Sequence, residues 1–369
     1  MKPVLLGVIG CGNVLGAYRL SIDQLRLTGD AEVTVVCGRE NQRPNAAKML
    51  GSARFATDER EVLFSPEVDV VILLTSMAQH APLAIKALNA GKHVLVEKPF
   101  ATTLDDADEV LGAAARNERL LVCAPFTVLS PTFQTMARRI RDGSIGKPCL
   151  ARARYGWSGP WWSEWFYKPG GGCLSDLAVY NLTSLTGLLG PARRVTAMSG
   201  VAIPEREVNG TKLAVEAEDN AQVLLDFGEG AFGVVTSGFT MQQYRSPAIE
   251  IYGSTGVIQM LGDDWDPDGY ELWQNKVGAW QLFKETDPDW HWTAGLPLLV
   301  ESLQRGSIEP LLRPEHARHV LEILVKARQS AKEGRTLPIE STFEPLKLAA
   351  TEAQEAAHTI HDRSRSHAT

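Results

Sequence analysis

The sequence contains no run of basic residues, and its overall charge is acidic. Its 369 residues include 37 Lys and Arg but 44 Asp and Glu, which gives a formal net charge of −7. Proteins that bind nucleic acids present a basic face to the phosphates. We therefore expect no nucleic-acid partner.

Cysteine is scarce as well. The five cysteines are odd in number and far apart in the sequence: Cys11, Cys37, Cys123, Cys149 and Cys173. This spacing supports neither a disulfide framework nor a zinc site. We expect reduced thiols, no bound metal and a cytoplasmic protein.

Long apolar runs are also absent. No stretch approaches the roughly 20 apolar residues that are needed to cross a membrane. The apolar run within residues 1–10 is too short for a secretion signal and continues directly into a glycine turn. We expect no membrane partner, and the chain length suggests two globular domains.

The first third of the sequence contains short apolar runs that alternate with helical patterns. The runs lie at residues 4–9, 33–37, 68–75, 92–97 and 120–124, and the helical patterns include residues 81–89 and 104–116. Such alternation is typical of a parallel sheet that is covered on both faces. With right-handed crossovers it predicts an α/β Rossmann domain for dinucleotide binding, which we place at residues 1–125.

The pattern changes after residue 125. Segments of alternating apolar and polar residues follow, separated by glycine turns, at residues 150–155, 195–202, 221–227, 232–239, 249–252 and 257–261. They predict a large, mainly antiparallel sheet with one packed face and one open face. We expect an α+β domain for substrate binding and oligomerisation at residues 126–345, with an amphipathic helix at 315–332. A C-terminal helical tail at 346–369 would end in polar, frayed residues.

A glycine-rich turn follows the first predicted strand and precedes a helix. Gly10 allows a tight turn, and Gly12 lets the backbone approach a pyrophosphate at the helix N-terminus. The third glycine position holds Leu15, and Gly16 comes one residue late. The predicted cofactor contacts in this turn are Gly10, Gly12, Asn13, Val14 and Leu15.

The end of the second predicted strand bears on the choice of cofactor. An acidic residue there normally binds the ribose 2′-hydroxyl of NAD, but this chain has Gly38 followed by Arg39. A guanidinium without a neighbouring carboxylate suits the 2′-phosphate of NADP. We favour NADP over NAD, with Gly38 and Arg39 as cofactor-binding residues. The alternatives are that Glu40 binds the ribose or that Arg39 is simply solvated.

Another predicted strand ends in Glu97-Lys98-Pro99, at the carboxyl edge where open α/β sheets bind ligands. A lysine at this edge can hold a substrate hydroxyl and lower the pKa of a neighbouring group. A surface lysine at a strand end is the alternative.

In their order along the chain, these motifs resemble the Gfo/Idh/MocA oxidoreductases, named for glucose–fructose oxidoreductase and inositol dehydrogenase. The resemblance includes Gly10-Cys11-Gly12-Asn13, Thr75 with His80 five residues later, Glu97-Lys98-Pro99 and Gly170-Gly171-Gly172, and it reaches Gly334-Arg335-Thr336-Leu337. It implies a nicotinamide cofactor contacted also by Thr75, His80, Glu97 and Lys98. It further implies a catalytic role for Lys98 and an open-faced sheet that often forms homo-oligomers, here dimers or tetramers.

The family usually carries Asp-x-Gly-x-His where this chain has Asp176, Ala178 and Tyr180. Residues four apart share one face of a helix, so Asp176 and Tyr180 are expected to point into the cleft together. Tyrosine at this position resembles glucose–fructose oxidoreductase and the dimeric dihydrodiol dehydrogenases. A phenol can act as an acid or a base if an ammonium stabilises the phenolate, and Lys98 is the expected ammonium. A tyrosine that only packs its ring is the alternative.

Aromatic residues crowd the segment before the triple glycine. Trp161, Trp162 and Tyr167 belong to this cluster, and their rings can stack on the C–H faces of a sugar or cyclitol. A lid packed on itself or on a neighbouring subunit is the alternative. His291, between two tryptophans, is a further candidate substrate contact, although a structural histidine explains it as well.

One acidic segment imitates the start of a calcium-binding loop. It runs from Asp264 to Gly269, but its twelfth position is Asn275 rather than glutamate, and no predicted helices flank it. We interpret the segment as a solvated β-turn.

The sequence as a whole predicts an NAD(P)-dependent oxidoreductase that transfers a hydride to or from a carbinol carbon of a sugar, glycoside or cyclitol. Three alternatives stay open: an enzyme like dihydrodiol dehydrogenase, a redox-assisted glycosidase, and a cofactor-binding sensor without turnover. The expected partners are a small polyol or carbohydrate and further copies of the chain.

Overall fold

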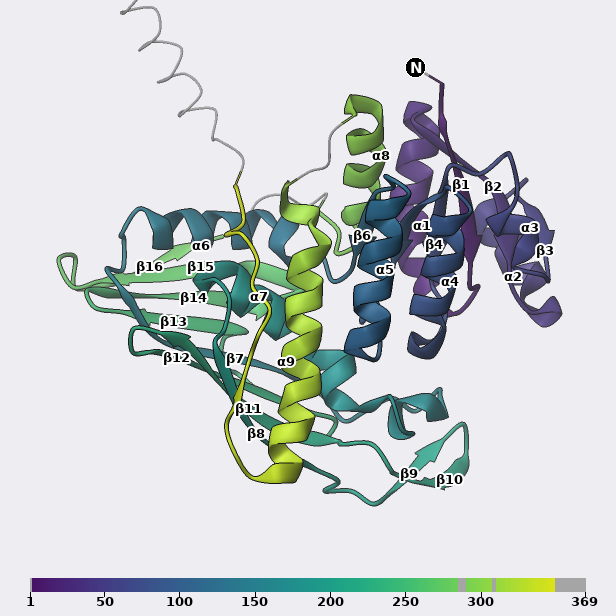
Figure 1. Cartoon of the computed structure of the whole chain (residues 1–369). Coiled ribbons are helices and arrows are strands. Elements are labelled where there is room, and N and C mark those ends of the chain that lie inside the picture. The colour runs from purple at the N-terminus through teal and green to yellow at the C-terminus, as the bar shows by residue number, and fades with distance from the viewer. Residues whose placement is uncertain (1, 285–289, 307–309, 349–369) are drawn as a thin grey trace, which may run out of the picture.

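The computed structural model describes residues 2–284, 290–306 and 310–348 (Figure 1). Two sheets lie side by side, and each carries its own layer of helices. The smaller, N-terminal sheet is drawn in purple and blue, and the larger sheet in teal and green.

The N-terminal sheet has six strands in the order β3-β2-β1-β4-β5-β6, and every neighbouring pair is parallel. This confirms the predicted Rossmann sheet. The first strand matches its apolar run, the second begins two residues before its run, and the last three are shorter than theirs by one or two residues at each end, while β3 was not predicted. The strands are β1 (Val4–Ile9), β2 (Ala31–Cys37), β3 (Arg54–Ala56), β4 (Val70–Leu73), β5 (His93–Val96) and β6 (Leu121–Cys123).

The helices of this domain connect successive strands. Helix α5 begins after Thr103, whose hydroxyl accepts a hydrogen bond from the Asp106 amide at 3.1 Å and so caps the helix. Helix α4 begins four residues before the predicted start and contains Pro82 in its second turn. The helices are α1 (Asn13–Thr28), α2 (Arg43–Leu50), α3 (Arg60–Leu63), α4 (Met77–Asn89) and α5 (Leu104–Arg116).

The second sheet has nine strands in the order β16-β15-β14-β13-β7-β12-β11-β8-β17. All neighbouring pairs are antiparallel except β12 and β7, which are parallel. This confirms the large, mainly antiparallel sheet. Its strands are β7 (Pro148–Gly156), β8 (Arg194–Gly200), β11 (Asn220–Gly228), β12 (Ala231–Gly238), β13 (Ile249–Gly253), β14 (Gly256–Asp263), β15 (Asp266–Gln274), β16 (Trp280–Phe283) and β17 (Leu337–Pro338). A separate hairpin pairs β9 (Glu205–Val208) with β10 (Thr211–Ala214).

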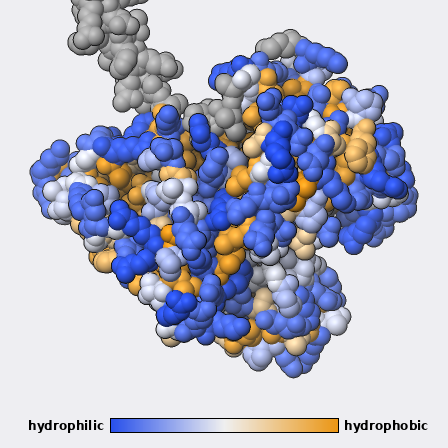
Figure 2. Space-filling view, in the orientation of Figure 1, coloured by the Kyte–Doolittle hydropathy of each residue, from blue (hydrophilic) through white to orange (hydrophobic). Residues whose placement is uncertain are grey.

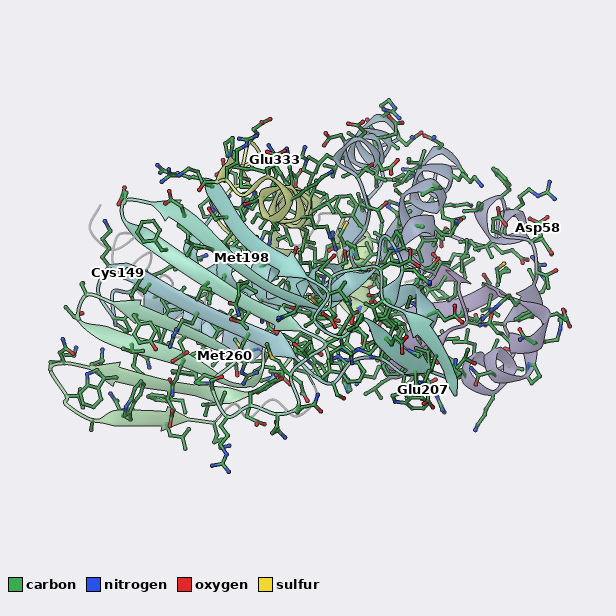
Figure 3. The ribbon with its side chains drawn as sticks, turned by 90° about the horizontal axis from the view of Figure 1, so that it is seen from below. Asp58, Cys149, Met198, Glu207, Met260 and Glu333 are labelled. Carbon is green, nitrogen blue, oxygen red and sulfur yellow. The ribbon has the colours of Figure 1, made fainter. Side chains whose placement is uncertain are left out.

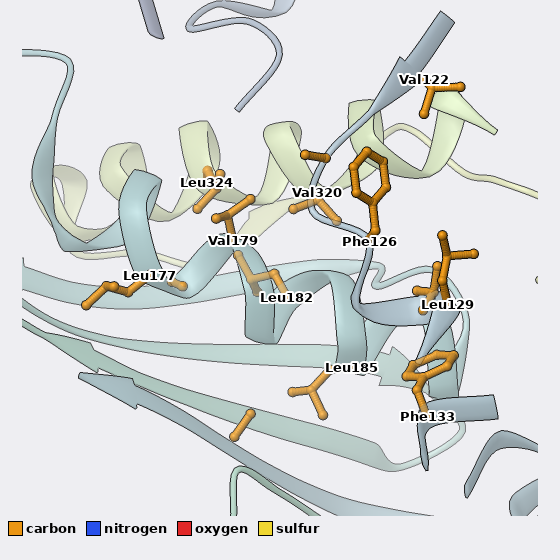
Figure 4. Close-up of a cluster of buried hydrophobic side chains, with 14 of the residues drawn as sticks. Val122, Phe126, Leu129, Phe133, Leu177, Val179, Leu182, Leu185, Val320 and Leu324 are labelled. Carbon is orange, nitrogen blue, oxygen red and sulfur yellow. The ribbon is translucent and has the colours of Figure 1, made fainter. Parts of the chain in front are cut away.

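Helices cover one face of this sheet. The covering helices are α6 (Pro131–Arg141), α7 (Val179–Leu189) and α9 (Pro314–Glu333), while α8 (Gly295–Arg305) packs against α1. Figure 4 shows Leu182 and Leu185 of α7 between the sheet and Val320 and Leu324 of α9. All four side chains are buried. Because burying one such side chain stabilises the fold by roughly 1.5–3 kcal/mol, this packing holds α7 firmly.

Helix α9 also joins the two domains, because Leu321 packs into the core of the Rossmann domain and Arg318 bonds Asp108 of α5 at 2.9 Å. Its bounds agree with the amphipathic helix predicted at residues 315–332. Of the predicted helical tail, only residues 346–348 are described. They form no helix, and the rest lies outside the described residues.

None of the described helices covers the opposite face of the nine-stranded sheet. Figure 3 looks onto it and labels Met198 and Cys149. Four large apolar side chains are exposed there, with Met198 at 79% and Leu150, Leu224 and Phe232 at 42–54%. Seen from the side of Figure 1, the surface is mostly polar with smaller apolar areas (Figure 2). No described helix combines the length and apolar character of a membrane span.

Candidate active site

The glycine turn after β1 is shaped to receive a ligand. Gly10 has φ +111°, and a Cβ there would lie 2.5 Å from the Leu74 carbonyl oxygen, so only glycine fits. A Cβ at Gly12 would meet nothing within 4 Å, so the backbone faces open space. Asn13 is exposed and Val14 half-buried. Leu15 is fully buried in the core, so the side chain at the third glycine position faces away from the turn.

The N-terminus of α1 opens into the same space. Gly12 is its N-cap residue, no side chain caps the helix, and its first turn contains no acidic residue. Free backbone N–H groups at the positive end of a helix dipole bind phosphate groups. The turn and the helix therefore fit the pyrophosphate of a dinucleotide.

The loop after β2 contains two residues that could contact the ribose, Arg39 and Glu40, and their surroundings differ. The Glu40 carboxylate is held by the Arg43 guanidinium through bonds of 2.7 and 2.8 Å, whereas Arg39 is exposed. A Cβ at Gly38 would lie 2.7 Å from the Cys11 sulfur, so the fold leaves little room for an acidic side chain at this position. Gln42 links the two loops, because its side chain bonds the Arg39 amide and the Cys11 carbonyl.

Lys98 and Asp176 meet at the carboxyl edge of the Rossmann sheet, although they lie 78 residues apart in sequence. The Lys98 ammonium donates to Asp176 Oδ1 at 2.8 Å and to the Asp176 carbonyl at 2.7 Å. Their side chains are 11% and 14% exposed, so the pair is mostly shielded but reachable. The preceding residue, Glu97, accepts hydrogen bonds from the Lys98 amide and from the Tyr18 hydroxyl of α1.

Asp176 does not lie in the α-helix that the sequence suggested. It belongs to a π-helical segment, Leu174–Ala178, which runs directly into α7. The wider turn leaves the Asp176 carbonyl available to the Lys98 ammonium. Such π segments occur frequently at functional sites.

His80 is enclosed within the fold, whereas Thr75 is half-buried in the loop after β4. His80 is 1% exposed, and its ring nitrogens lie 2.8 Å from the Pro99 carbonyl and 3.1 Å from the Thr75 carbonyl. Burial lowers the pKa of His80. The prediction of His80 as a cofactor contact is therefore corrected, because the ring is enclosed and connects the loop after β4 to the turn that carries Lys98.

Tyr180, on the first turn of α7, lies beside the pair. The Lys98 Nζ is 4.8 Å from the centre of its ring, and the ring packs edge-on against Tyr155. Among the described residues, the Tyr180 hydroxyl has no hydrogen-bond partner, so it is free to bind a ligand.

The electrostatics of Tyr180 differ from the expectation. Burial raises the pKa of Tyr180 well above its ordinary value, and the carboxylates of Glu97 and Asp176 raise it further. The expected stabilisation of a phenolate by Lys98 is wrong, because the ammonium lies over the ring and its hydrogen bonds go to Asp176. Tyr180 is a protonated phenol at neutral pH.

The aromatic cluster is partly packed on itself. Trp162 stacks on Trp157 with ring centres 5.4 Å apart, and Trp161 stands edge-on to it and is 66% exposed. The turn of the β9–β10 hairpin holds this segment, because Asn209 donates to the carbonyls of Trp161 and Trp162. Figure 3 labels Glu207 on this hairpin.

Tyr167 does not reach the cleft. It is 1% exposed, and its hydroxyl donates to the Pro160 carbonyl at 2.7 Å. The prediction of Tyr167 as a substrate contact is therefore corrected, since this ring belongs to the core beneath the cluster.

His291 lies half-buried in the loop before α8. Its neighbours fix this loop to α1, because Trp292 packs edge-on against Tyr18 and the Thr293 hydroxyl lies 2.8 Å from that of Ser21. The loop therefore supports Tyr18, which in turn bonds Glu97.

Sequence reasoning missed two residues near Tyr180. Tyr18 carries no motif, and only the fold brings its hydroxyl to Glu97. Asp264 was interpreted as part of a solvated turn, but it is 1% exposed, which corrects that interpretation. Across the described residues, no group of three or more His, Cys, Asp or Glu gathers as metal ligands do.

Comparisons with known proteins agree with this geometry. Residues 4–124 match the oxidoreductase family with an NAD-binding Rossmann fold, and residues 133–259 match the GFO/IDH/MocA C-terminal domain. D-apiose dehydrogenase of Paraburkholderia graminis is 26% identical over 356 residues, covering 90% of this chain and 89% of the relative. A dTDP-3,4-didehydro-2,6-dideoxy-alpha-D-glucose 3-reductase of Saccharopolyspora spinosa is 31% identical, covering 70% of this chain and 74% of the relative.

A solved structure has the same fold. Levoglucosan dehydrogenase in complex with NADH and levoglucosan superposes with a TM-score of 0.83 at 20% identity, covering 92% of this chain and 100% of that structure. The sequence motifs, the two sheets and the two family models all indicate the same family. The chain belongs to the Gfo/Idh/MocA family of NAD-binding oxidoreductases.

Proposed function

We propose that this protein is an NADP(H)-preferring oxidoreductase that transfers a hydride to or from a carbinol carbon of a sugar or cyclitol. The observation that carries the proposal is the Lys98–Asp176 pair beside the free Tyr180 hydroxyl, next to an open glycine turn. The names of the relatives support a sugar-like substrate, since they include an apiose dehydrogenase and a dTDP-sugar reductase.

In this proposal the cofactor and the substrate bind to different domains. Residues 1–125 would hold the dinucleotide through Gly10, Gly12 and the N-terminus of α1, and residues 126–345 would hold the substrate. A bound nicotinamide supplies the hydride donor or acceptor. The five free cysteines support a reducing compartment, which we propose is the cytoplasm.

The proton is handled by this chain's own residues. The Tyr180 phenol is protonated at neutral pH, so it carries the proton that a substrate carbonyl oxygen takes up during reduction. Lys98 would hold the same oxygen with its third N–H, while Asp176 fixes the direction of the ammonium. Removal of a hydroxyl proton during oxidation would be favoured at alkaline pH.

A substrate panel tests the proposed function. Sugars, polyols and cyclitols are offered with each nicotinamide, and the absorbance of the reduced form is followed. We expect turnover on at least one sugar or cyclitol. Release of the aglycone from a glycoside would instead indicate a redox-assisted glycosidase, and tight cofactor binding without turnover would indicate a sensor.

The preference for NADP is predicted to depend on Arg39. Arg39→Gln should weaken NADP binding by about tenfold or more, because a charge-assisted bond to the 2′-phosphate is lost, and should leave NAD binding unchanged. Calorimetry measures both dissociation constants. Arg26→Gln, at the far end of α1, is the control. Tighter binding of NAD than of NADP by the wild type would contradict the preference.

The exposed edge of the aromatic cluster is proposed to form part of the substrate wall. Trp161→Ala should raise KM about three- to tenfold and change kcat little, because ring stacking acts equally on the ground state and the transition state. Steady-state kinetics on the best substrate measures the effect. Trp280→Ala, on the outer strand β16, is the matched control. Unchanged kinetics for Trp161→Ala would assign the cluster a structural role.

The open face of the nine-stranded sheet is proposed to pair with a second copy of the chain. Its exposed apolar side chains border a hollow of about 330 Å³ lined by Leu150, Leu224, Phe232 and Tyr252, among others. Met198→Lys combined with Leu224→Lys should convert the oligomer to a monomer, because charges would be buried in an apolar contact. Light scattering after gel filtration measures the mass. A monomeric wild type would contradict this proposal.

A further inference from the structure

Asp264 is a carboxylic side chain enclosed at the centre of the second domain. With Trp265 it forms the turn between β14 and β15, and this turn points into the molecule rather than into solvent. Asp264 is 1% exposed. Tyr180 lies close to it, because Asn181 and Ser184, which bond Asp264, belong to the same helix α7. A buried carboxyl so close to the phenol requires an explanation.

Only one oxygen of this carboxyl has partners among the described residues. Asp264 Oδ2 accepts from the Asn181 side-chain N–H at 3.0 Å and lies 3.0 Å from the Ser184 hydroxyl. Asp264 Oδ1 is buried without a partner, and so is Asn181 Oδ1. Both partners belong to α7, and Asn181 directly follows Tyr180.

A single proton on the carboxyl would give both of these oxygens a hydrogen-bond partner. Both are acceptors, so neither can satisfy the other while the carboxyl is ionised. A proton on Asp264 Oδ1 would let it donate to Asn181 Oδ1, while the Asn181 N–H donates to Asp264 Oδ2. The carboxylic acid and the amide would then form a closed ring of two hydrogen bonds, and no buried acceptor would be left unmatched.

The charges around Asp264 favour the protonated form. Asp263, its neighbour in the turn, is already bonded by Arg154 of β7 and by Tyr244, so that arginine is engaged elsewhere. The titratable side chains nearest to Asp264 on α7 and β7 are Tyr180 and Tyr155, and both are neutral phenols. Lys98 lies beyond the Tyr180 ring and is bonded to Asp176. Burial raises the pKa of Asp264 to about 7.

We propose that Asp264 is a neutral carboxylic acid that pairs with Asn181 and thereby positions Tyr180 at the start of α7. Asp264 is a positioning residue, because it acts through Asn181 and touches no reacting atom. The pair attaches the first turns of α7 to the β14–β15 turn, at the point where the π-helical segment ends. The kinetic part of this inference rests on the proposed function, whereas the pairing itself does not.

Three variants test the pairing. Asp264→Asn keeps a neutral group that can donate and accept, so an amide–amide ring replaces the acid–amide ring. Asp264→Ala removes both hydrogen bonds and leaves Asn181 unsatisfied. Asp266→Asn, at an exposed position of the same hairpin, is the matched control.

Infrared spectroscopy at pH 6 observes the proton directly and needs no turnover. We expect the wild type and Asp266→Asn to show the carbonyl stretch of a buried, protonated carboxylic acid, and Asp264→Asn to lack it. Absence of this band from the wild type would overturn the proposal, and would show that the free oxygens are satisfied in another way, such as by a bound water.

Thermal unfolding gives a second readout. The neutral carboxyl contributes stability that is present at low pH and is lost as the pH rises through its folded pKa, because the unfolded carboxyl releases its proton near pH 4. Asp264→Asn cannot lose this contribution. Its Tm should therefore rise relative to the wild type between about pH 4 and pH 7, with no such trend for Asp266→Asn. A constant difference would overturn the proposal.

Kinetics tests the positioning of Tyr180. Asp264→Asn should keep kcat within about threefold of the wild type, whereas Asp264→Ala should lower kcat by about tenfold with nucleotide affinity unchanged. Equal losses in both variants would overturn the positioning role. If no sugar is turned over but the infrared band is present, the proposed function fails and the pairing stands.

Discussion

Replacing Lys98 by methionine is expected to lower kcat by about 100-fold or more, because the site loses the cation that holds the substrate oxygen. The buried ammonium bonds Asp176 twice, so its removal also frees that carboxylate to turn away from the productive geometry. Nucleotide binding should remain close to normal, since the glycine turn and the N-terminus of α1, which would hold the pyrophosphate, are unchanged by the substitution. Stopped-flow kinetics and nucleotide titration measure the two effects.

Lys92→Met is the matched control, because it makes the same change at the opposite end of β5. The Lys92 ammonium bonds the carbonyls of Ser65 and Val68 and therefore has a structural role. We expect its kcat to be unchanged and its stability to fall slightly. Near-normal turnover of Lys98→Met on the true substrate would remove the centre of the proposed mechanism and favour a cofactor sensor.

Replacing Tyr180 by phenylalanine is expected to lower kcat for carbonyl reduction by a similar factor, about 100-fold, because the proton donor is lost while the ring is kept. In the wild type the phenol stays protonated well beyond neutrality, so we expect no decline in reduction from ionisation of Tyr180 between pH 6 and pH 9. Rates measured across this range check both statements.

Two further variants define the role of this phenol. Tyr180→His, which restores the residue usual in the family, should retain more turnover than Tyr180→Phe, because imidazole can also transfer a proton. Tyr155→Phe changes the neighbouring ring in the same way and should have a much smaller effect. Lys98→Met combined with Tyr180→Phe should be far from additive, since the two groups act on one oxygen. A fully additive double variant would mean that they act independently.

Much of the fold could be predicted from periodicity. Continuous apolar runs separated by helical patterns predicted the parallel sheet, because strands buried on both faces cannot alternate with polar residues. Alternation after residue 125 predicted the sheet with one open face, and the exposed Met198 and Leu224 lie on that face. Glycine turns set the limits of the strands less sharply, so strand ends differ by a few residues.

The local chemistry of the site could be predicted only in part. The family resemblance indicated Lys98 and Asp176 as site residues, but only the fold shows that the two side chains bond each other. The raised pKa of Tyr180 could not be predicted, because desolvation and the carboxylates of Glu97 and Asp176 depend on residues far apart in sequence. The burial of His80 and Tyr167 could not be predicted either. The sequence beside a motif does not distinguish an aromatic or polar residue that faces a ligand from one that faces the core.

The sequence by itself determined the nucleotide turn, the strand-end lysine and the order of the two domains, because each depends on neighbouring residues and on local backbone geometry. Only the tertiary structure decided which side chains face the cleft and what charge surrounds them. Asp264 shows the difference most clearly: its sequence context is typical of a solvated turn, yet the packing of β14, β15 and α7 encloses it beside Tyr180. Burial is a property of the whole fold, and so is the protonation state that burial imposes.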